Sequence, residues 1–294
     1  MNGLSRLRVS DLRIGTPLKG ATWFRAQHAF RIFVSLIFLF VLFHEPRFLY
    51  GDGWLEIKDK HFVVFYNLSQ DESLARSVLR KAEDYYDKIA YRVGYQRYSD
   101  FWTWDDRVKI MIFSDQKTYQ KKTGQPAWSL GYSTRDSYLF KSRSIVTYRQ
   151  QGEFVDGLLP HEISHLVLKD LIGFDRKIPV WFDEGVAQLQ EAKKKEDAYV
   201  LMKNLVSQGQ YVKFDALMKG DIRGETDARK IMIFYAQSLV MVDFLIKEYG
   251  NDAFIYLCRE LRQGKTMEDA FKTAYSSIGS IGEFEKKWLR EFGQ

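Results

Sequence analysis

The sequence predicts an α+β fold, with a small mixed sheet near the N-terminus followed by a mostly helical C-terminal half. Of the 294 residues, 46% are hydrophobic and 16% are aromatic, which is ample apolar material for a packed core. The strand-like apolar runs all lie before residue 150. From Phe154 onward, apolar residues recur almost throughout at helical spacing, and strands followed by helices indicate an α+β fold.

The predicted strands and helices of the N-terminal part follow from local patterns. His61–Tyr66 is a strand-like run, and Glu72–Val93 carries apolar residues at helical spacing. Arg107–Phe113 alternates charged and apolar residues before it becomes wholly apolar, which predicts a second strand. Asp115 can cap a short helix that follows. Two more short strands are predicted within Tyr138–Tyr148.

The C-terminal half predicts a series of helices. These are Leu158–Leu171, Val180–Glu191, Asp197–Val206, Ala228–Tyr249, Asp252–Leu261, Met267–Tyr275 and Phe284–Phe292. The sequence contains no internal repeat and no Gly-rich phosphate loop in the context that such a loop requires. We expect a separate N-terminal segment at residues 1–53 and a folded domain at residues 54–294.

The formal net charge of +6 is concentrated at the N-terminus. Residues 1–50 hold seven Lys and Arg against Asp11 and Glu45, so this segment carries +5 of the total. A nucleic-acid-binding protein would be expected to carry its basic excess on the folded part. The sequence therefore predicts no nucleic-acid partner, and residues 193–195 are interpreted as a solvated helix end.

The apolar segment Ile32–Phe43 follows Arg25 and Arg31. Basic residues followed by an apolar stretch are typical of a signal peptide or a signal anchor. Its twelve residues reach only about 18 Å of a roughly 30 Å hydrocarbon core, so a spanning helix would have to start near Ala26. Cleavage and anchoring both stay open, and a buried core helix is a third interpretation. Either targeting form would export the C-terminal part to the periplasmic or extracellular face.

Cys258 is the single cysteine, so no intramolecular disulfide can form. An exported domain must then be held together by its core or by a metal. The apolar neighbours of Cys258 predict a small buried hydrophobic residue, with a catalytic thiol as the alternative. His61, at the head of a strand, is predicted to be structural.

Residues 161–165, HEISH, place two histidines four positions apart on a predicted helix. Positions four apart differ by about 40° in azimuth and about 6 Å in height, so the rings of His161 and His165 can converge on one ion. Glu162 lies about 100° further round, where its carboxylate could take a proton from a water on the metal. A catalytic zinc needs three protein ligands and an open position for water, so a third ligand is expected elsewhere.

A second helix within Pro179–Ala187 is predicted to supply the third ligand. Eighteen residues separate His165 from Glu184, which lets the chain leave the first helix and return alongside it. Asp183 is the alternative ligand. Gln188, one turn after Glu184, could orient a ligand or could be a plain exposed glutamine.

These two motifs resemble those of the gluzincin metallopeptidases. HEISH and Trp181–Ala187 together closely resemble the peptidase MA-like proteins of bacteria, whose second helix carries Trp-hydrophobe-x-Glu-Gly-x-Ala. The similarity extends over nearly all of residues 54–294. It implies a zincin-like fold and a Zn²⁺ cofactor held by His161, His165 and Glu184.

The resemblance also implies catalytic roles. Glu162 matches the general base of the family. In aminopeptidase relatives a tyrosine on a later helix stabilises the oxyanion, and Tyr235 resembles it, with a core aromatic as the alternative. The chain has no Gly-x-Met-Glu-Asn segment, so aminopeptidase specificity does not carry over.

The predicted function is zinc-dependent hydrolysis of peptide bonds, in which Glu162 assists the attack of a zinc-bound water. The expected partner is a peptide or protein substrate that adds as a strand to a sheet edge within Tyr138–Tyr148.

The alternative function is a catalytically silent, membrane-tethered binding module with the zincin fold. Amide hydrolysis of a non-peptide target such as cell-wall peptides would use the same chemistry. The sequence does not determine the physiological substrate, the endo or exo preference, or the oligomeric state.

Overall fold

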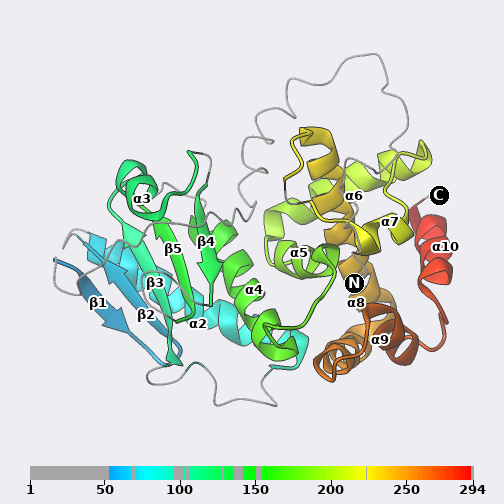
Figure 1. The fold of residues 1–294 in the computed structure, drawn as a ribbon, viewed down its shortest axis with the longest axis horizontal. Helices are drawn as coiled ribbons and strands as arrows, with labels where there is room; N and C mark the ends of the chain where they lie inside the picture. Colours follow the sequence, from blue (N-terminus) through cyan, green and yellow to red (C-terminus); the bar gives the residue numbers. More distant parts are fainter. Residues whose placement is uncertain are drawn as a thin grey trace, which may run out of the picture. The chain divides into compact units, whose positions relative to one another are not determined.

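The computed structural model describes residues 53–67, 71–95, 102, 106–127, 129–135, 142–149, 154–222 and 224–292. These residues form two compact units, which divide between Leu168 and Lys169. The first unit is built on a five-stranded sheet, and helices make up the second (Figure 1). The predicted α+β class, with a small mixed sheet before a mostly helical half, is confirmed.

The sheet of the first unit is mixed and has the order β1-β2-β3-β5-β4. Its strands are β1 (Leu55–Lys58), β2 (Phe62–Tyr66), β3 (Val108–Phe113), β4 (Gly131–Thr134) and β5 (Ser144–Tyr148). The neighbours β2, β3 and β5 run parallel, whereas β1 and β4 pair antiparallel at the two edges. Helix α2 (Glu72–Val93) lies between β2 and β3 in sequence, because parallel strands need a long crossover connection.

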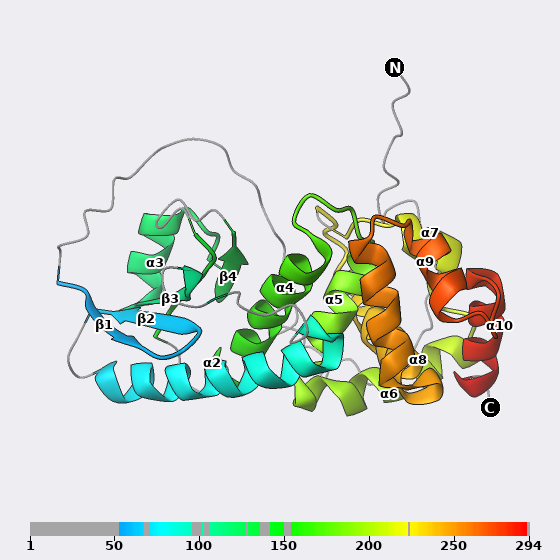
Figure 2. The ribbon, with the colours of Figure 1, turned by 90° about the horizontal axis from the view of Figure 1, so that it is seen from below.

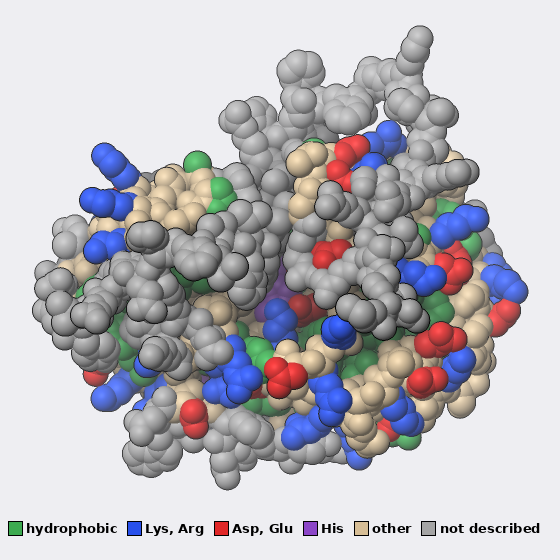
Figure 3. All heavy atoms as spheres, in the orientation of Figure 1, with side chains coloured by type: hydrophobic (Ala, Val, Ile, Leu, Met, Phe, Trp, Pro, Cys, Tyr) green, Lys and Arg blue, Asp and Glu red, His purple; other side chains and the backbone are tan. Residues whose placement is uncertain are grey.

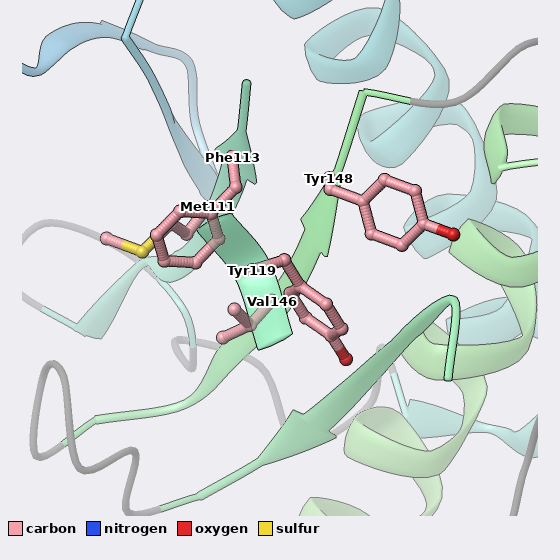
Figure 4. Close-up of a cluster of buried hydrophobic side chains, with 5 residues drawn as sticks. All are labelled: Met111, Phe113, Tyr119, Val146 and Tyr148. Carbon is pink, nitrogen blue, oxygen red and sulfur yellow. The ribbon is translucent and has the colours of Figure 1, made fainter. Parts of the chain in front are cut away.

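Both faces of the sheet are covered, which explains why its central strands are apolar on both sides. On one face, Tyr86 of α2 meets Phe62 edge to face, with ring centroids 6.1 Å apart. On the other face, helix α3 (Gln116–Thr123) contributes to a buried cluster (Figure 4). The members of that cluster are Met111, Phe113, Tyr119, Val146 and Tyr148. Figure 2 shows α2 and α3 on opposite sides of the sheet.

The ends of these helices agree with the sequence-based predictions. Helix α2 has the predicted bounds, and Gly94 ends it in the left-handed region with φ 75°. The side chain of Asp115 accepts a hydrogen bond from the backbone N–H of Thr118 at 2.8 Å, which confirms Asp115 as the N-cap of α3. Hydrogen bonds from Thr118 and Ser114 hold the pKa of Asp115 below its usual range.

The second unit is organised around one long helix. Its elements are α5 (Val180–Gln188), α6 (Ala192–Ser207), α7 (Phe214–Lys219), α8 (Ala228–Arg262), α9 (Met267–Ala274) and α10 (Ile281–Phe292). Helices α5, α6 and α9 all pack against α8. Because neighbours surround it, the stretch of α8 from Ile231 to Leu245 is buried at almost every position. The two helices predicted here are both present as the two parts of α8, which meet at a kink where Gly250 has non-helical angles (φ 83°, ψ 160°).

Several elements differ from the sequence-based predictions. Strands β1 and β4 and helix α7 were not predicted, because four to six residues give too short a pattern to recognise. Helix α6 begins at Ala192, five residues before the predicted start. The predicted strand at residues 138–140 lies outside the described residues.

For its described strand, the predicted substrate edge is wrong. The described part of Tyr138–Tyr148 is β5, which pairs with β3 on one side and β4 on the other, so its backbone is already used. A period-two pattern identifies a strand but not its position in a sheet. Strand β4 forms the edge next to β5.

Within the described residues, no helix combines the length and the hydropathy needed to cross a bilayer. Residues 1–52, with the apolar segment Ile32–Phe43, lie outside the described residues, so the targeting segment stays a prediction. Over the described part of the helical unit, Lys and Arg side chains are interspersed with Asp and Glu on the face drawn in Figure 3.

Candidate metal centre

Helix α4 (Leu159–Ile172) carries the HEISH motif in a buried position. His161 and Glu162 have no exposed surface, and His165 is 2% exposed. The Nε2 atoms of the two histidines lie 3.0 Å apart, with their rings inclined at 76°. Two Zn–N bonds of about 2.0–2.1 Å at a tetrahedral angle would separate the nitrogens by about 3.3 Å. The histidine pair therefore fits two ligands of one ion.

A π-helical turn, Phe154–Leu158, leads into α4. Such turns are frequent at functional sites. Asp156 of this turn accepts hydrogen bonds from Lys81 Nζ at 3.2 Å and from the Tyr85 hydroxyl at 3.0 Å, and both donors belong to α2. Burial and the hydrogen bond to Asp156 raise the pKa of Tyr85 to about 12, so its hydroxyl remains a donor at neutral pH. Helix α2 thus contacts the turn that precedes the histidine helix.

Helix α5 presents Glu184, the predicted third ligand, and packs very closely on α8. A Cβ atom at Gly185 would lie 2.4 Å from the backbone oxygen of Ser238, so only glycine permits this approach. The indole Nε1 of Trp181 donates to Met218 Sδ at 3.1 Å, which ties α5 to α7. The glycine of the Glu-Gly pair therefore has a geometric role. It allows α5, the helix that carries Glu184, to lie close to α8.

The three predicted ligands come together. His161, His165 and Glu184 each offer one ligand atom, and these atoms all lie within 4.8 Å of one another. Asp183, the alternative third ligand, instead forms an ion pair with Lys169 at 3.2 Å. Within the described residues, the candidate metal-binding group contains Glu184 and not Asp183.

The surroundings of this group contain buried oxygens that need a partner. Neither carboxylate oxygen of Glu162 has a hydrogen-bond partner among the described residues, and neither does Oε1 of Gln188. A buried carboxylate without a partner is costly by several kcal/mol, whereas a cation and its water would satisfy these atoms. The donor set therefore fits a hydrated divalent metal. Gln188 is 1% exposed, so the interpretation as a plain exposed glutamine is wrong.

Tyr119 is a residue near this centre that the sequence did not single out. Its hydroxyl is buried and pairs with Ser129 Oγ at 2.8 Å. Burial raises the pKa of Tyr119, the hydrogen bond with Ser129 partly opposes this rise, and the charge of Glu162 adds a smaller increase. In the sequence, Tyr119 is the one aromatic residue in the otherwise polar stretch Gln116–Thr123. This pattern predicts only a side chain that faces the core.

The remaining predicted residues have simpler environments. Tyr235 lies on α8, one turn before Ser238, and is 1% exposed. Its burial agrees with both the catalytic and the core interpretation. Cys258 is fully buried, and burial raises its pKa, which confirms the buried-hydrophobic interpretation. The structural interpretation of His61 is also confirmed, because its Nδ1 lies 2.6 Å from Glu83 Oε2 and its ring packs on Tyr86.

Comparison with known proteins identifies the class of the chain. A sequence model of the Peptidase MA superfamily matches residues 107–292, which include both ligand-bearing helices. The chain belongs to this superfamily, whose members are typically metal-dependent peptidase-type hydrolases, and its α+β fold is of the zincin-like kind.

One relative among curated proteins is the uncharacterized protein YhcO of Bacillus subtilis (strain 168). It is 30% identical to this chain over 199 residues, which make up 63% of this chain and 58% of YhcO. The chain therefore spans less than two thirds of the length of that relative. This relative is described as uncharacterized, so the similarity adds no activity.

Proposed function

We propose that this chain is a zinc metallopeptidase of the gluzincin type, with His161, His165 and Glu184 as metal ligands. The observation that carries the proposal is the buried group of two imidazoles and one carboxylate whose ligand atoms lie within 4.8 Å of one another. Two histidines and one glutamate are a donor set of catalytic zinc, and they leave a coordination position for water.

Zinc, when bound, would supply a Lewis acid that polarises the scissile carbonyl and lowers the pKa of a water to about 7. Glu162 would take the proton from the attacking water. It would then pass this proton to the leaving nitrogen, so that an N–H bond forms as the C–N bond breaks. Complete burial of Glu162 favours this role, because bulk water does not compete for its carboxylate. Tyr235 is assigned to the oxyanion of the tetrahedral intermediate.

The proposed substrate is an extended peptide paired with the edge strand β4. This edge lies against the start of the histidine helix, because a Cβ atom at Gly131 would come within 2.8 Å of Leu158 Cδ2. Strand addition supplies affinity through main-chain hydrogen bonds and makes small demands on the substrate sequence. Export through residues 1–53, with membrane anchoring or cleavage, remains part of the proposal.

Replacement of the general base tests this function. Full-length wild type and Glu162→Gln are incubated with unfolded casein and with a mixed peptide library, and the fragments are read by mass spectrometry. We expect about one zinc per chain in both proteins and a 10²- to 10⁴-fold loss of hydrolysis in the variant. Glu268→Gln, at an exposed position of α9, is the matched control and should cleave as wild type does.

Equal cleavage by wild type and Glu162→Gln would refute the assignment of the general base. Zinc-loaded wild type that yields no fragments, or fragments that persist with a chelator, would favour the catalytically silent binding module.

A further inference from the structure

An ion pair joins the two helices that carry the proposed ligands. Lys169 Nζ, in the last turn of α4, lies 3.2 Å from Asp183 Oδ2, in the first turn of α5. The side chains are 30% and 14% exposed, and both residues belong to the helical unit. A partly buried pair is less screened by solvent and salt than a fully exposed pair, so it can restrain its two helices more strongly.

Each member of the pair lies next to a proposed ligand in its own helix. Lys169 follows His165 by four residues and His161 by eight, so the three side chains lie along one stripe of α4. Asp183 immediately precedes Glu184 in α5. Since α4 is one continuous helix from Leu159 to Ile172, a restraint at Lys169 is transmitted to the histidines.

Helix α5 contacts α4, α7 and α8 through different residues. Residues 173–179 connect the two helices without a regular element. The close contact at Gly185 and the indole bond of Trp181 hold α5 against α8 and α7. The ion pair of Lys169 and Asp183 joins α4 directly to α5.

We infer that Lys169 and Asp183 are positioning residues, whose ion pair sets Glu184 at the correct height beside His161 and His165. The pair thereby determines the affinity of the centre for its metal. This inference rests on the proposed function, because it requires that the three residues bind one ion. Neither member of the pair is itself a ligand.

The direction in which zinc affinity changes distinguishes a positioning role of Lys169 from a purely electrostatic effect. A lysine cation near a divalent metal repels it, so loss of that charge alone would strengthen metal binding. If Lys169 acts by fixing α5, its loss weakens metal binding instead. Loss of the Asp183 charge weakens binding in both cases, so the lysine variant is the decisive one.

The test measures zinc affinity of the full chain by competition with a chromophoric chelator. Lys169→Met and Asp183→Asn should each weaken zinc binding by about tenfold, as is usual when a group that orients a ligand is removed. The double variant should also lose about tenfold and not a hundredfold, because either single change already breaks the pair. Lys169→Arg, which keeps the charge and reach, should bind zinc within about twofold of wild type.

A second ion pair provides the control. Lys272 and Glu268 of α9 lie 2.9 Å apart on the surface, and Lys272→Met should leave zinc affinity unchanged. Zinc-free thermal midpoints of all variants, compared with wild type, show whether any loss of affinity reflects unfolding.

Unchanged or tighter zinc binding by folded Lys169→Met would overturn the inference, and so would additive losses in the double variant. A wild-type chain that holds no zinc would instead overturn the proposed function itself.

Discussion

Helices α4 and α5 contribute to the same candidate centre in different ways. In α4, the spacing of His161, Glu162 and His165 brings three functional groups together through the helical repeat alone. In α5, Glu184 is a single carboxylate whose position depends on contacts made by its neighbours. Gly185 allows α5 to approach α8, and Asp183 meets Lys169. Local geometry therefore positions three of the four groups of the centre, and tertiary packing positions the fourth.

The largest expected effect comes from removal of a ligand from either helix. His165→Ala and Glu184→Ala should each lower zinc affinity by about a hundredfold or more, because loss of a direct ligand exceeds the 10- to 100-fold effect of a residue that only orients one. Chelator competition on the full chain measures both. If Glu184→Ala kept the zinc affinity of wild type, α5 would supply no ligand. The proposed difference between the two helices would then be wrong.

An intermediate effect is expected at Gly185, which adds no ligand. Gly185→Ala should lower the free energy of unfolding by about 1–3 kcal/mol, because the new methyl group would collide with Ser238 and Val242 of α8. It should also weaken zinc binding by displacing Glu184. Chemical denaturation and zinc competition measure the two effects.

Gly282 of α10 is the matched control for this change. A Cβ atom there meets its nearest neighbour only at 3.9 Å, so Gly282→Ala should change stability by less than about 1 kcal/mol. Equal effects at Gly185 and Gly282 would contradict the proposed role of close helix packing.

The smallest expected effect concerns the acid stability of the helical unit. Asp243 of α8 is 4% exposed and accepts hydrogen bonds from Lys195 at 2.8 Å and from the Tyr199 hydroxyl at 2.7 Å. Burial raises the pKa of Asp243, but the hydrogen bonds from Lys195, Tyr199 and Lys247 outweigh burial and hold this pKa below its usual range.

The folded-state pKa of Asp243 is thus lower than its unfolded value near 3.9. Its stabilising contribution is present above that value and is lost as the pH falls through the folded-state pKa. Asp243→Asn should therefore be less stable than wild type at pH 7, and the difference should narrow below about pH 4. Denaturant titrations at several pH values measure it. A difference that stays constant from pH 7 to pH 3 would contradict this account.

Sequence patterns predicted those features that depend on local geometry. The bounds of α2, the N-cap Asp115 and the convergence of His161 and His165 follow from helical spacing and capping chemistry. Glu184 required the resemblance to a family, because spacing alone left Asp183 open.

The features that the sequence did not predict arise from packing between distant segments. Strand β4 is the edge of the sheet because of its pairing with β5, which no local pattern contains. Tyr119 meets Ser129 only because α3 folds over the sheet, and Lys169 meets Asp183 only when α5 returns beside the end of α4. Such contacts depend on the tertiary fold, so no local sequence pattern contains them.

The coordination of zinc in the full-length chain tests the central claim most directly. X-ray absorption at the zinc edge should show two imidazole nitrogens at about 2.0–2.1 Å together with oxygen ligands at about 2.0–2.2 Å, and no sulfur. A zinc ion with a sulfur ligand, or with fewer than two imidazoles, would contradict the claim that His161, His165 and Glu184 close around one metal.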